Sequence, residues 1–384
     1  MLRLPKLIEK LNFSTTVFNI LIRMGLMLTI YPEKYYPEAK NFCNLFLNET
    51  AIPRYVFGRN EYAASIANFV DVTGFIDEFT NKKSYLGKPV VKIADLPKDS
   101  MVVSAVVLGR PLIALNKLKS NGLNGLDYFA FLKYSGLAFK EIEVLYKGKE
   151  DIKINRDKYE WVYNRLKDET SKHVLEKLLN FRFSYDLNYM KGFKHTPDRQ
   201  YFEDFLGLKP GEVFVDGGGF DGQTVINLIE RCPDYQSIYF FEPDPKNVII
   251  ARNNLSEYPN IYFYTLGLAE SKKTLRFGSG AGAASKICET GDIEIQVDSI
   301  DNLINEPISF IKMDIEGSEE IAIEGAKNHI RNDHPKLAIC CYHKFDDIWK
   351  IPEQVLAIRD DYAIYLRHYT EGTTETVIYF IPDV

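Results

Sequence analysis

The chain has 384 residues, the length of about two ordinary domains, and 46% of them are hydrophobic, too many for a largely disordered protein. Its formal net charge of −6, from 47 Lys and Arg against 53 Asp and Glu, argues against a nucleic-acid substrate. The five cysteines show no C-x-x-C spacing and no disulfide framework, so we expect a reducing, cytoplasmic location.

Residues 1–49 are predicted to form a helical extension. The segment MLRLPKLIEKLNFSTTVFNILIRMGLMLTI has Arg23 inside its apolar part, and no small-residue cleavage site follows it. It therefore fits neither a signal peptide nor a transmembrane segment. We interpret it as an amphipathic helix, with peripheral contact to a membrane surface as the alternative.

Residues 50–145 are predicted to form a small Rossmann-like α/β domain. RYVFGRNEYAASIANF predicts a strand, a tight turn and a helix, and the segments VTGFIDEF, VVKIADLP and SMVVSAVVLG supply further strands. Strands that alternate with helices are typical of a parallel sheet. Gly58 stands alone where a phosphate-binding turn has two or three glycines, although Asp77 occupies the acidic position after the second strand. We expect an assembly module, such as a homodimer interface; a nucleotide-sugar site with Arg59 on a phosphate is the alternative.

This segment, YVFGRNEYA…VTGFIDEF…GKPVVKIADL, is similar to the Rossmann-like domain that precedes sugar acyltransferases of nucleotide-sugar pathways. The resemblance implies that the domain can bind a nucleotide-sugar. Residues 146–200 follow as a predicted helical bridge, because DKYEWVYNRLKDETSKHVLEKLLNFRF spaces its apolar residues at helical intervals.

Residues 201–384 alternate strands and helices regularly. The predicted strands are 213–217, 237–242, 261–266, 309–314 and 337–342, and the predicted helices are 222–231, 245–257, 318–332 and 347–359. The last two strands, YAIYLRHY and ETVIYFIP, are joined by so few residues that they must be antiparallel. We predict a doubly wound α/β sheet closed by an antiparallel hairpin, which is the usual layout of methyltransferases that use S-adenosyl-L-methionine (SAM).

The first predicted turn of this half, VFVDGGGFDGQTV, contains G-x-G-x-x-G at Gly217, Gly219 and Gly222. This spacing is the fingerprint of dinucleotide sites, where a pyrophosphate lies against the turn. Asp216 at the strand end would repel a pyrophosphate by roughly 3 kcal/mol at about 5 Å and an effective dielectric near 20. SAM carries no phosphate and two cationic groups, so the sequence favours SAM. Glu242, at the end of the second strand, fits the hydroxyls of an adenosine ribose.

The stretch that runs GEVFVDGGGFDGQTV…YFFEPDP…SFIKMDIEGSEEIAIEGAK…HPKLAICCYH…YLRHY…ETVIYFIP resembles the FkbM-type SAM-dependent methyltransferases. The resemblance covers about residues 195–384, and IKMDIEGSE is its most specific part. It implies O-methylation of a sugar or a hydroxylated natural product, often in cell-surface glycan assembly. The predicted partner is therefore a sugar or glycan acceptor, free or linked to a nucleotide or a lipid.

The candidate catalytic residues follow two predicted strands at their carboxyl ends, where an α/β sheet binds its ligands. Asp314 and Glu316 end FIKMDIEG and His343 ends the next strand, and together they can position and deprotonate a hydroxyl group. A divalent cation held by the same three residues is an alternative that we do not predict. His368 is a weaker candidate. The predicted cofactor-binding residues are Asp216, Gly217, Gly218, Gly219, Gly222, Glu242, Asp244, Gly267, Leu268 and Tyr201.

Two other functions stay open at this point. One is a non-catalytic carbohydrate-binding or assembly subunit that keeps the methyltransferase fold, and intact Asp216, Glu242 and Asp314 count against it. The other is an NAD-dependent sugar oxidoreductase, which Asp216 and the terminal hairpin disfavour.

Overall fold

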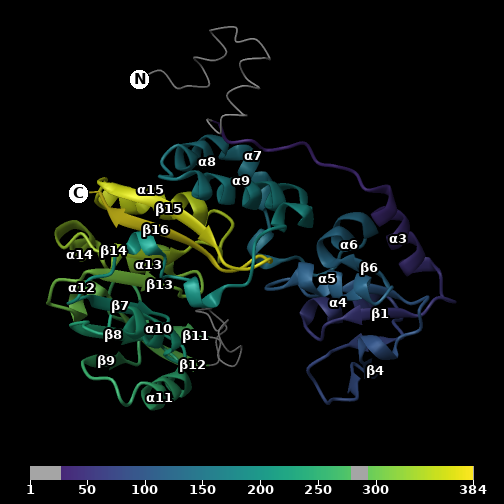
Figure 1. The fold of residues 1–384 in the computed structure, drawn as a ribbon, viewed down its shortest axis with the longest axis horizontal. Coiled ribbons are helices and arrows are strands. Elements are labelled where there is room, and N and C mark those ends of the chain that lie inside the picture. The colour runs from purple at the N-terminus through teal and green to yellow at the C-terminus, as the bar shows by residue number, and fades with distance from the viewer. Residues whose placement is uncertain (1–26, 278–292, 384) are drawn as a thin grey trace, which may run out of the picture.

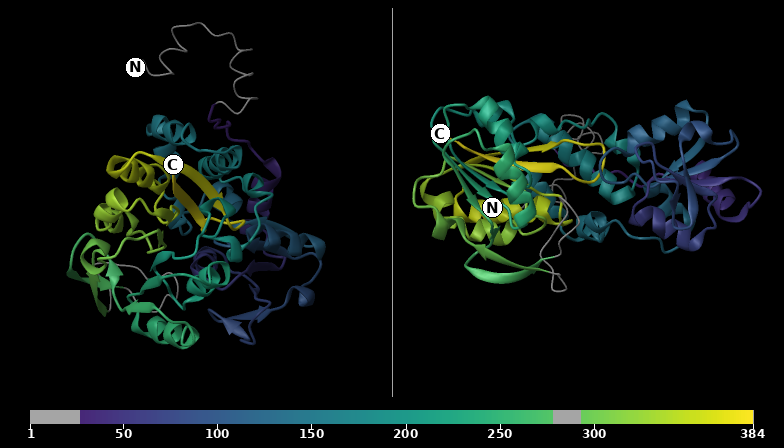
Figure 2. Two further views of the ribbon diagram at one scale, coloured as in Figure 1. Left: turned by 60° about the vertical axis from the view of Figure 1, so that its left-hand side comes forward. Right: turned by 90° about the horizontal axis from the view of Figure 1, so that it is seen from below.

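The structure is a computed structural model that describes residues 27–277 and 293–383 (Figure 1). The predicted amphipathic helix at the N-terminus therefore lies mostly outside the described residues. Two α/β domains lie side by side, and a group of helices packs on the second (Figures 1 and 2). None of the described helices combines the length and the apolar character that crossing a membrane requires.

The first domain is built on a six-stranded sheet with the order β3-β4-β2-β1-β5-β6, parallel except for the β3–β4 pair. This confirms the predicted parallel α/β fold. Its strands are β1 (Arg54–Phe57), β2 (Gly74–Ile76), β3 (Ser84–Tyr85), β4 (Lys88–Val91), β5 (Met101–Ser104) and β6 (Asn124–Asp127). Its helices are α3 (Pro37–Asn48), α4 (Glu61–Phe69), α5 (Pro111–Ser120) and α6 (Tyr128–Ser135).

Local capping explains where two of these helices begin. The Asn60 side chain accepts a hydrogen bond from Ala63 N at the start of α4, and Asp127 accepts one from Ala130 N at the start of α6. Helix α3 belongs to this domain although it lies in the predicted extension, because its Phe46 ring meets the Phe131 ring of α6 edge to face at 5.3 Å.

The bridge consists of three helices: α7 (Gly148–Ile154), α8 (Arg156–Tyr163) and α9 (Glu169–Ser184). Helix α9 lies against the second domain, where Asp168 pairs with Arg367 at 2.6 Å and Ser171 Oγ accepts from Leu366 N. The predicted helical character of this segment is confirmed, and α9 contacts the first domain as well, where its Phe181 ring meets the Phe129 ring of α6 edge to face at 4.9 Å.

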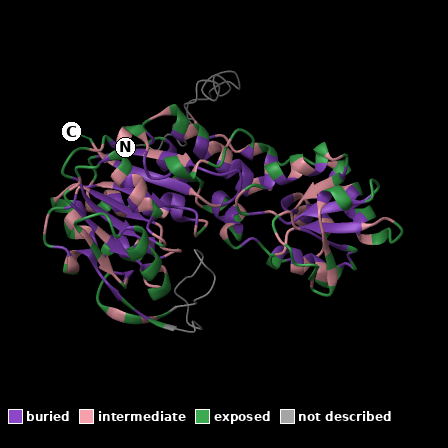
Figure 3. Ribbon diagram, turned by 60° about the horizontal axis from the view of Figure 1, so that its bottom comes forward, coloured by how far each residue is buried: buried purple, intermediate pink, exposed green. Residues whose placement is uncertain are grey.

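The second domain is a seven-stranded sheet with the order β15-β16-β14-β13-β7-β8-β9. Only β16 runs antiparallel to its neighbours, so the predicted doubly wound sheet with a closing hairpin is confirmed. The central strands of both sheets are buried, and the strands toward the sheet edges are partly exposed (Figure 3). The strands are β7 (Val213–Gly217), β8 (Ser237–Phe241), β9 (Ile261–Tyr264), β13 (Phe310–Met313), β14 (Lys336–Cys340), β15 (Tyr362–His368) and β16 (Thr376–Pro382). The helices are α10 (Gln223–Arg231), α11 (Pro245–Asn254), α12 (Ile300–Leu303), α13 (Glu319–Glu324), α14 (Lys327–Asn332) and α15 (Asp347–Ile358).

A small sheet that the sequence did not predict packs beside this domain. It has the order β10-β12-β11, with β10 (Gly267–Leu268), β11 (Lys273–Phe277) and β12 (Ile293–Asp298). The single helix predicted at 318–332 is two helices, with Gly325 between them. The Gly325 carbonyl oxygen accepts a hydrogen bond from Asp301 N at 2.9 Å, and a Cβ at Gly325 would lie 2.0 Å from the Ala269 carbonyl oxygen, so only glycine fits at this contact.

The tip of the β15–β16 hairpin reaches the first domain (Figures 1 and 2). Thr373 N donates to Leu108 O at 3.0 Å, and Glu371 N donates to Gly109 O at 3.1 Å. A Cβ at Gly372 would lie 1.8 Å from Leu108 O, so the hairpin tip and the loop after β5 approach as closely as two backbone segments can. The loop that follows β5 therefore holds the hairpin tip.

Candidate active site

The glycine turn between β7 and α10 passes directly over the ends of β13 and β8. Gly218 has φ +74°, and a Cβ there would lie 1.9 Å from Asp314 O. A Cβ at Gly219 would lie 2.1 Å from the Phe240 ring. These close approaches, rather than flexibility alone, require glycine at both positions.

Asp216 is completely buried and does not face the cavity that the turn encloses. Its Oδ1 lies 2.9 Å from Lys312 Nζ, which also donates to the carbonyl oxygens of Gly217 and Gly218. Burial lowers the pKa of Lys312, but the carboxylates of Asp216 and Asp314 outweigh this effect and raise it. Asp216 thus holds the lysine that fixes the turn, a different role from the direct attraction of a cationic ligand that we predicted.

Glu242 follows β8 and is locked in place at the cavity wall. Its carboxylate accepts hydrogen bonds from Phe220 N at 3.1 Å, Asp244 N at 2.9 Å and the Asn247 amide at 3.3 Å. The side chain is buried, and its remaining capacity to accept hydrogen bonds faces the cavity, as a ribose-binding carboxylate requires.

The second group of polar side chains lies where β13 and β14 end. Asp314 Oδ2 accepts from the Tyr201 hydroxyl at 2.6 Å and Oδ1 from the Tyr342 hydroxyl at 3.2 Å. His343 Nε2 lies 3.4 Å from Asp314 Oδ1 and 3.5 Å from Glu316 Oε2. The three predicted catalytic residues are therefore brought together.

The local backbone explains how Glu316 reaches this group. Strand β13 ends at Met313, so simple strand alternation does not extend to Glu316 as expected. Instead Glu316 has φ +56°, a left-handed conformation that is uncommon for a residue other than glycine and is often found at functional sites.

The surrounding charges shift the pKa values of this group strongly. Burial disfavours charged His343, but the carboxylates of Glu319, Asp314 and Glu316 raise its pKa to about 10. Burial raises the pKa of Glu316 to about 7. An imidazole surrounded by three carboxylates lies in a strongly negative potential, which favours a bound cation of any kind.

Both groups face one cavity of about 290 Å³. Its lining residues are Tyr201, Gly218, Gly219, Phe220, Asp221, Gln223, Thr224, Phe241, Glu242, Pro243, Asn247, Leu266, Gly267, Leu268, Ile295, Lys312, Asp314, Ile315, Glu316, Ser318, Tyr342 and Glu375. Eight predicted site residues are in this lining: Tyr201, Gly218, Gly219, Glu242, Gly267, Leu268, Asp314 and Glu316.

The other predicted site residues lie behind the lining. His343 is covered by Asp314 and Glu316, and its side chain is only 7% exposed. Asp244 accepts from Lys246 N and caps α11. Gly217 and Gly222 allow close packing, since a Cβ at either would lie 2.8 Å from a leucine side chain.

Glu375 is the main residue that the sequence did not indicate. It follows the hairpin tip at φ +63°, lines the cavity and accepts a hydrogen bond from the Gln200 amide at 2.5 Å. Nothing in its sequence spacing marks it, because only the return of the hairpin toward the strand ends brings it to the site.

Two weaker candidates, His368 and Arg59, are bound elsewhere in the fold. His368 is buried in the hairpin, where its Nδ1 lies 2.9 Å from Thr376 Oγ1 and its ring packs on Phe193, away from the cavity. Arg59, suggested for a phosphate, is instead paired with Asp77 at 2.7 Å. The nucleotide-sugar alternative for the first domain thus lacks a free guanidinium at this position.

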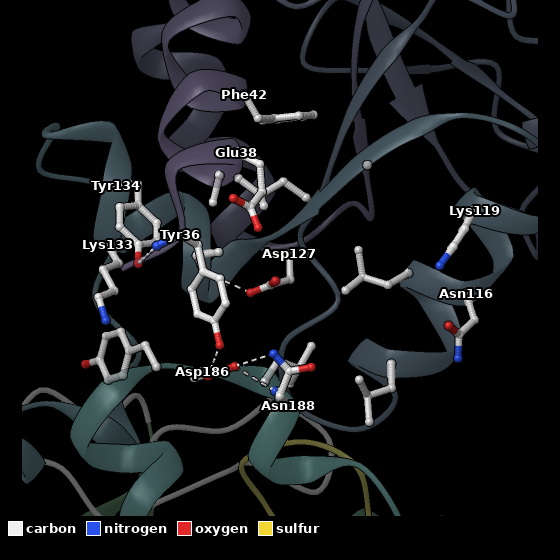
Figure 4. A pocket seen from close by; sticks show the side chains of 18 of the residues that line it. Tyr36, Glu38, Phe42, Asn116, Lys119, Asp127, Lys133, Tyr134, Asp186 and Asn188 are labelled. Atoms are coloured by element: carbon white, nitrogen blue, oxygen red, sulfur yellow. Dashed lines mark hydrogen bonds between the residues drawn. The ribbon is translucent and has the colours of Figure 1, made fainter. Parts of the chain in front are cut away.

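A second cavity, of about 550 Å³, lies between α3, α5, α6 and the turn after α9 (Figure 4). Several of its polar groups already bind one another: the Tyr36 hydroxyl donates to Asp186 at 2.6 Å, and Lys133 donates to Ser184 O. The described residues that line it include no glycine turn and no strand-end cluster of the kind found in the first cavity.

Comparison with known protein families finds a match in the domain that holds the first cavity. Residues 216–369 match the model of the methyltransferase FkbM domain, which confirms the predicted resemblance. A crystal structure of a methyltransferase FkbM from Methylobacillus flagellatus KT is 24% identical, with a TM-score of 0.71. The alignment covers 95% of this chain and 97% of that one, so the fold of both domains is shared.

Two further solved structures show weaker similarity. An rRNA methylase from Streptococcus thermophilus is 16% identical over 47% of this chain and 92% of that one, with a TM-score of 0.32. An O-methyltransferase from Bacillus cereus in complex with SAH is 11% identical over 56% of this chain and 91% of that one, with a TM-score of 0.32. No curated protein sequence matches the chain. The similarity of the first domain to acyltransferase domains stays a prediction.

Proposed function

We propose that this chain transfers the methyl group of SAM to a hydroxyl oxygen of a sugar or glycan acceptor. One observation carries the proposal: a single cavity joins the glycine turn and Glu242 at one end to Asp314, Glu316 and Glu375 at the other. The first end suits an adenosine with a free ribose, and the second suits a polar acceptor beside a cationic sulfonium.

The charges of the lining favour SAM over NAD. The carboxylates of Asp221, Glu242, Asp314, Glu316 and Glu375 all line the cavity, against the single paired ammonium of Lys312. A pyrophosphate there would meet several like charges, each costing roughly 3 kcal/mol at about 5 Å and an effective dielectric near 20. The discrimination we assigned to Asp216 thus rests on the lining carboxylates as a set.

The reaction itself needs alignment and removal of one proton. The acceptor oxygen attacks the methyl carbon, the O–C bond forms as the S–C bond breaks, and neutral S-adenosylhomocysteine leaves. The hydroxyl proton passes to a lining carboxylate. Both Asp314 oxygens are fixed by tyrosine hydroxyls, so this residue is preorganised to accept a hydrogen bond from the acceptor.

Calorimetry with SAM, S-adenosylhomocysteine and NAD tests the cofactor, and a 14-Da mass gain per methyl group on candidate glycans tests the transfer. Asp314→Asn should abolish transfer and leave SAM affinity within a few-fold, because this residue serves the acceptor. If NAD binds and SAM does not, the oxidoreductase alternative holds. If SAM binds but no hydroxylated acceptor is methylated, a binding subunit is the better description.

Cellular location and assembly are part of the proposal. The cysteines Cys43, Cys232, Cys340 and Cys341 are all free thiols and buried, which supports a reducing, cytoplasmic environment. A homodimer through the first domain stays a prediction that sedimentation of the intact chain would check.

A further inference from the structure

The imidazole of His343 is buried, and neither Nε2 nor Nδ1 makes a hydrogen bond to any described residue. A buried polar nitrogen without a partner is costly and calls for a physical reason. Its nearest polar neighbours are the carboxylate oxygens of Asp314 and Glu316, at 3.4 and 3.5 Å. These separations are long for hydrogen bonds, so the three atoms surround a point rather than bind one another.

The spacing of these atoms fits a metal ion. One atom from each of Asp314, Glu316 and His343 lies within 4.8 Å of the others. A cation about 2.1 Å from each ligand separates its ligands by about 3.4 Å in tetrahedral geometry and about 3.0 Å between neighbours in octahedral geometry. The two measured edges, from His343 Nε2 to Asp314 and to Glu316, lie close to this range, and the third pair, Asp314 and Glu316, lies within 4.8 Å.

The neighbours of the three residues are those that metal ligands require. His343 Nδ1 lies 3.0 Å from a Glu319 oxygen, close enough for this carboxylate to take the Nδ1 proton once Nε2 holds a cation, although the two groups are not aligned as a hydrogen bond without one. The Tyr201 and Tyr342 hydroxyls hold Asp314. Ligating histidines usually donate their other ring nitrogen to a carboxylate, and ligating carboxylates are themselves hydrogen-bonded.

The charge balance points the same way. The carboxyl groups of Asp314, Glu316 and Glu319 surround one imidazole, and Lys312, which also lines the cavity, is already bound to Asp216. A divalent cation would offset the negative charge of this group. Two carboxylate oxygens and one imidazole nitrogen are a mixed set that suits a first-row transition cation better than a purely oxygen-seeking ion.

We propose that Asp314, Glu316 and His343 bind a divalent cation of the Mn²⁺ class, with its open positions toward the acceptor end of the cavity. Its catalytic role rests on the proposed methyl transfer; its binding does not. The acceptor oxygen binds the cation, which lowers the pKa of the hydroxyl. The proton passes to the Glu375 carboxylate, the oxygen attacks the methyl carbon, and S-adenosylhomocysteine leaves with the electrons of the broken S–C bond.

The test uses the full chain, stripped of metal with a chelator and desalted. Mn²⁺ is then titrated by calorimetry and by loss of the free-ion paramagnetic resonance signal. We expect one site per chain, weakened at least tenfold by His343→Ala and by Glu316→Gln. His334→Ala is the matched control, because this histidine faces the Asp361 carboxylate at 3.2 Å outside the cavity, and it should leave binding unchanged.

SAM binding reports whether each variant is folded, since Glu242 and the glycine turn lie at the other end of the cavity. If His343→Ala fails this check, Glu316→Gln decides, because its side chain is 26% exposed and its loss leaves no deep void. Mn²⁺ affinity that is equal in the intact chain and in Glu316→Gln, or no binding at all, overturns the site. Full methyl transfer in excess chelator overturns the catalytic role and leaves the methyltransferase proposal standing. Mn²⁺ binding without SAM binding supports the metal site and contradicts the methyltransferase proposal.

Discussion

Replacing Lys312 by methionine is expected to lower the free energy of unfolding by about 3–5 kcal/mol, the usual cost of removing one partner of a buried ion pair. The pair lies in the core of the site: the side chain of Lys312 is 2% exposed and that of Asp216 is 0% exposed. At their separation of 2.9 Å, two unit charges attract by about 6 kcal/mol at an effective dielectric near 20. Desolvation offsets much of this attraction while both partners are present, but a lone buried Asp216 keeps only the penalty.

The double variant separates the ion pair from simple loss of packing. Asp216→Asn combined with Lys312→Met removes the uncompensated charge, so it should be more stable than Lys312→Met alone. The carbonyl oxygens of Gly217 and Gly218 lose their ammonium donor in both variants. We therefore also expect SAM affinity to fall in both, because the turn is no longer fixed.

Urea unfolding followed by circular dichroism measures the stabilities, and calorimetry measures SAM binding. Lys350→Met is the matched control, since Lys350 pairs with Asp346 at 2.6 Å but is 36% exposed, and such pairs contribute less than about 1 kcal/mol. A loss below about 1 kcal/mol for Lys312→Met, or a double variant no more stable than the single one, would refute the argument.

Glu242→Gln should weaken SAM binding about tenfold, because it loses one charged hydrogen bond worth about 1.5 kcal/mol. Asp244→Asn should leave SAM binding unchanged, because Asp244 only caps a helix, and calorimetry compares the two variants. Gly372→Ala should raise the acceptor KM, since the added Cβ would lie 1.8 Å from Leu108 O and must push the hairpin tip from the first domain; steady-state kinetics measure it. Burial lowers the pKa of His368 to about 3 from an unfolded value near 6.5, so the unfolded chain binds the proton first and the folded protein loses stability as pH falls below about 6.5. Between about pH 6.5 and 5 this loss amounts to about 1–2 kcal/mol, and thermal melts of His368→Gln should lack that acid sensitivity.

Much of the second domain could be predicted because its strands are buried on both faces and end in recognisable turns. Strand β7 has the predicted bounds, 213–217, and the hairpin is antiparallel as expected. The small sheet was missed because β10 is only two residues long and because the alternation of apolar and polar residues in β12, IEIQVD, was not read as a strand. Its contact with Gly325 joins distant parts of the chain, which a local pattern does not contain.

The candidate site shows the same limit of sequence-based prediction, because contacts between distant residues decide what each side chain binds. Asp314, Glu316 and His343 were predicted because parallel strands end at one edge of the sheet, so residues that follow neighbouring strands must meet. The pairing of Asp216 with Lys312 joins positions far apart in the sequence and changes the role of a residue that was placed correctly. Strand position therefore predicts where a side chain lies better than it predicts which atom it binds.

The hairpin tip gives the first domain a structural role that its own sequence does not reveal. In a parallel α/β sheet, ligands usually bind beyond the carboxyl ends of the strands. Here the loop after β5 is engaged by Thr373 and Glu371, and the Glu371 carboxylate also accepts a hydrogen bond from Ile113 N near the start of α5. The chain then continues to Glu375, which lines the cavity. Because only Thr374 separates the domain contact at Thr373 from Glu375 in the cavity wall, the first domain fixes the Glu375 end of the cavity through the backbone, whether or not it binds a ligand of its own.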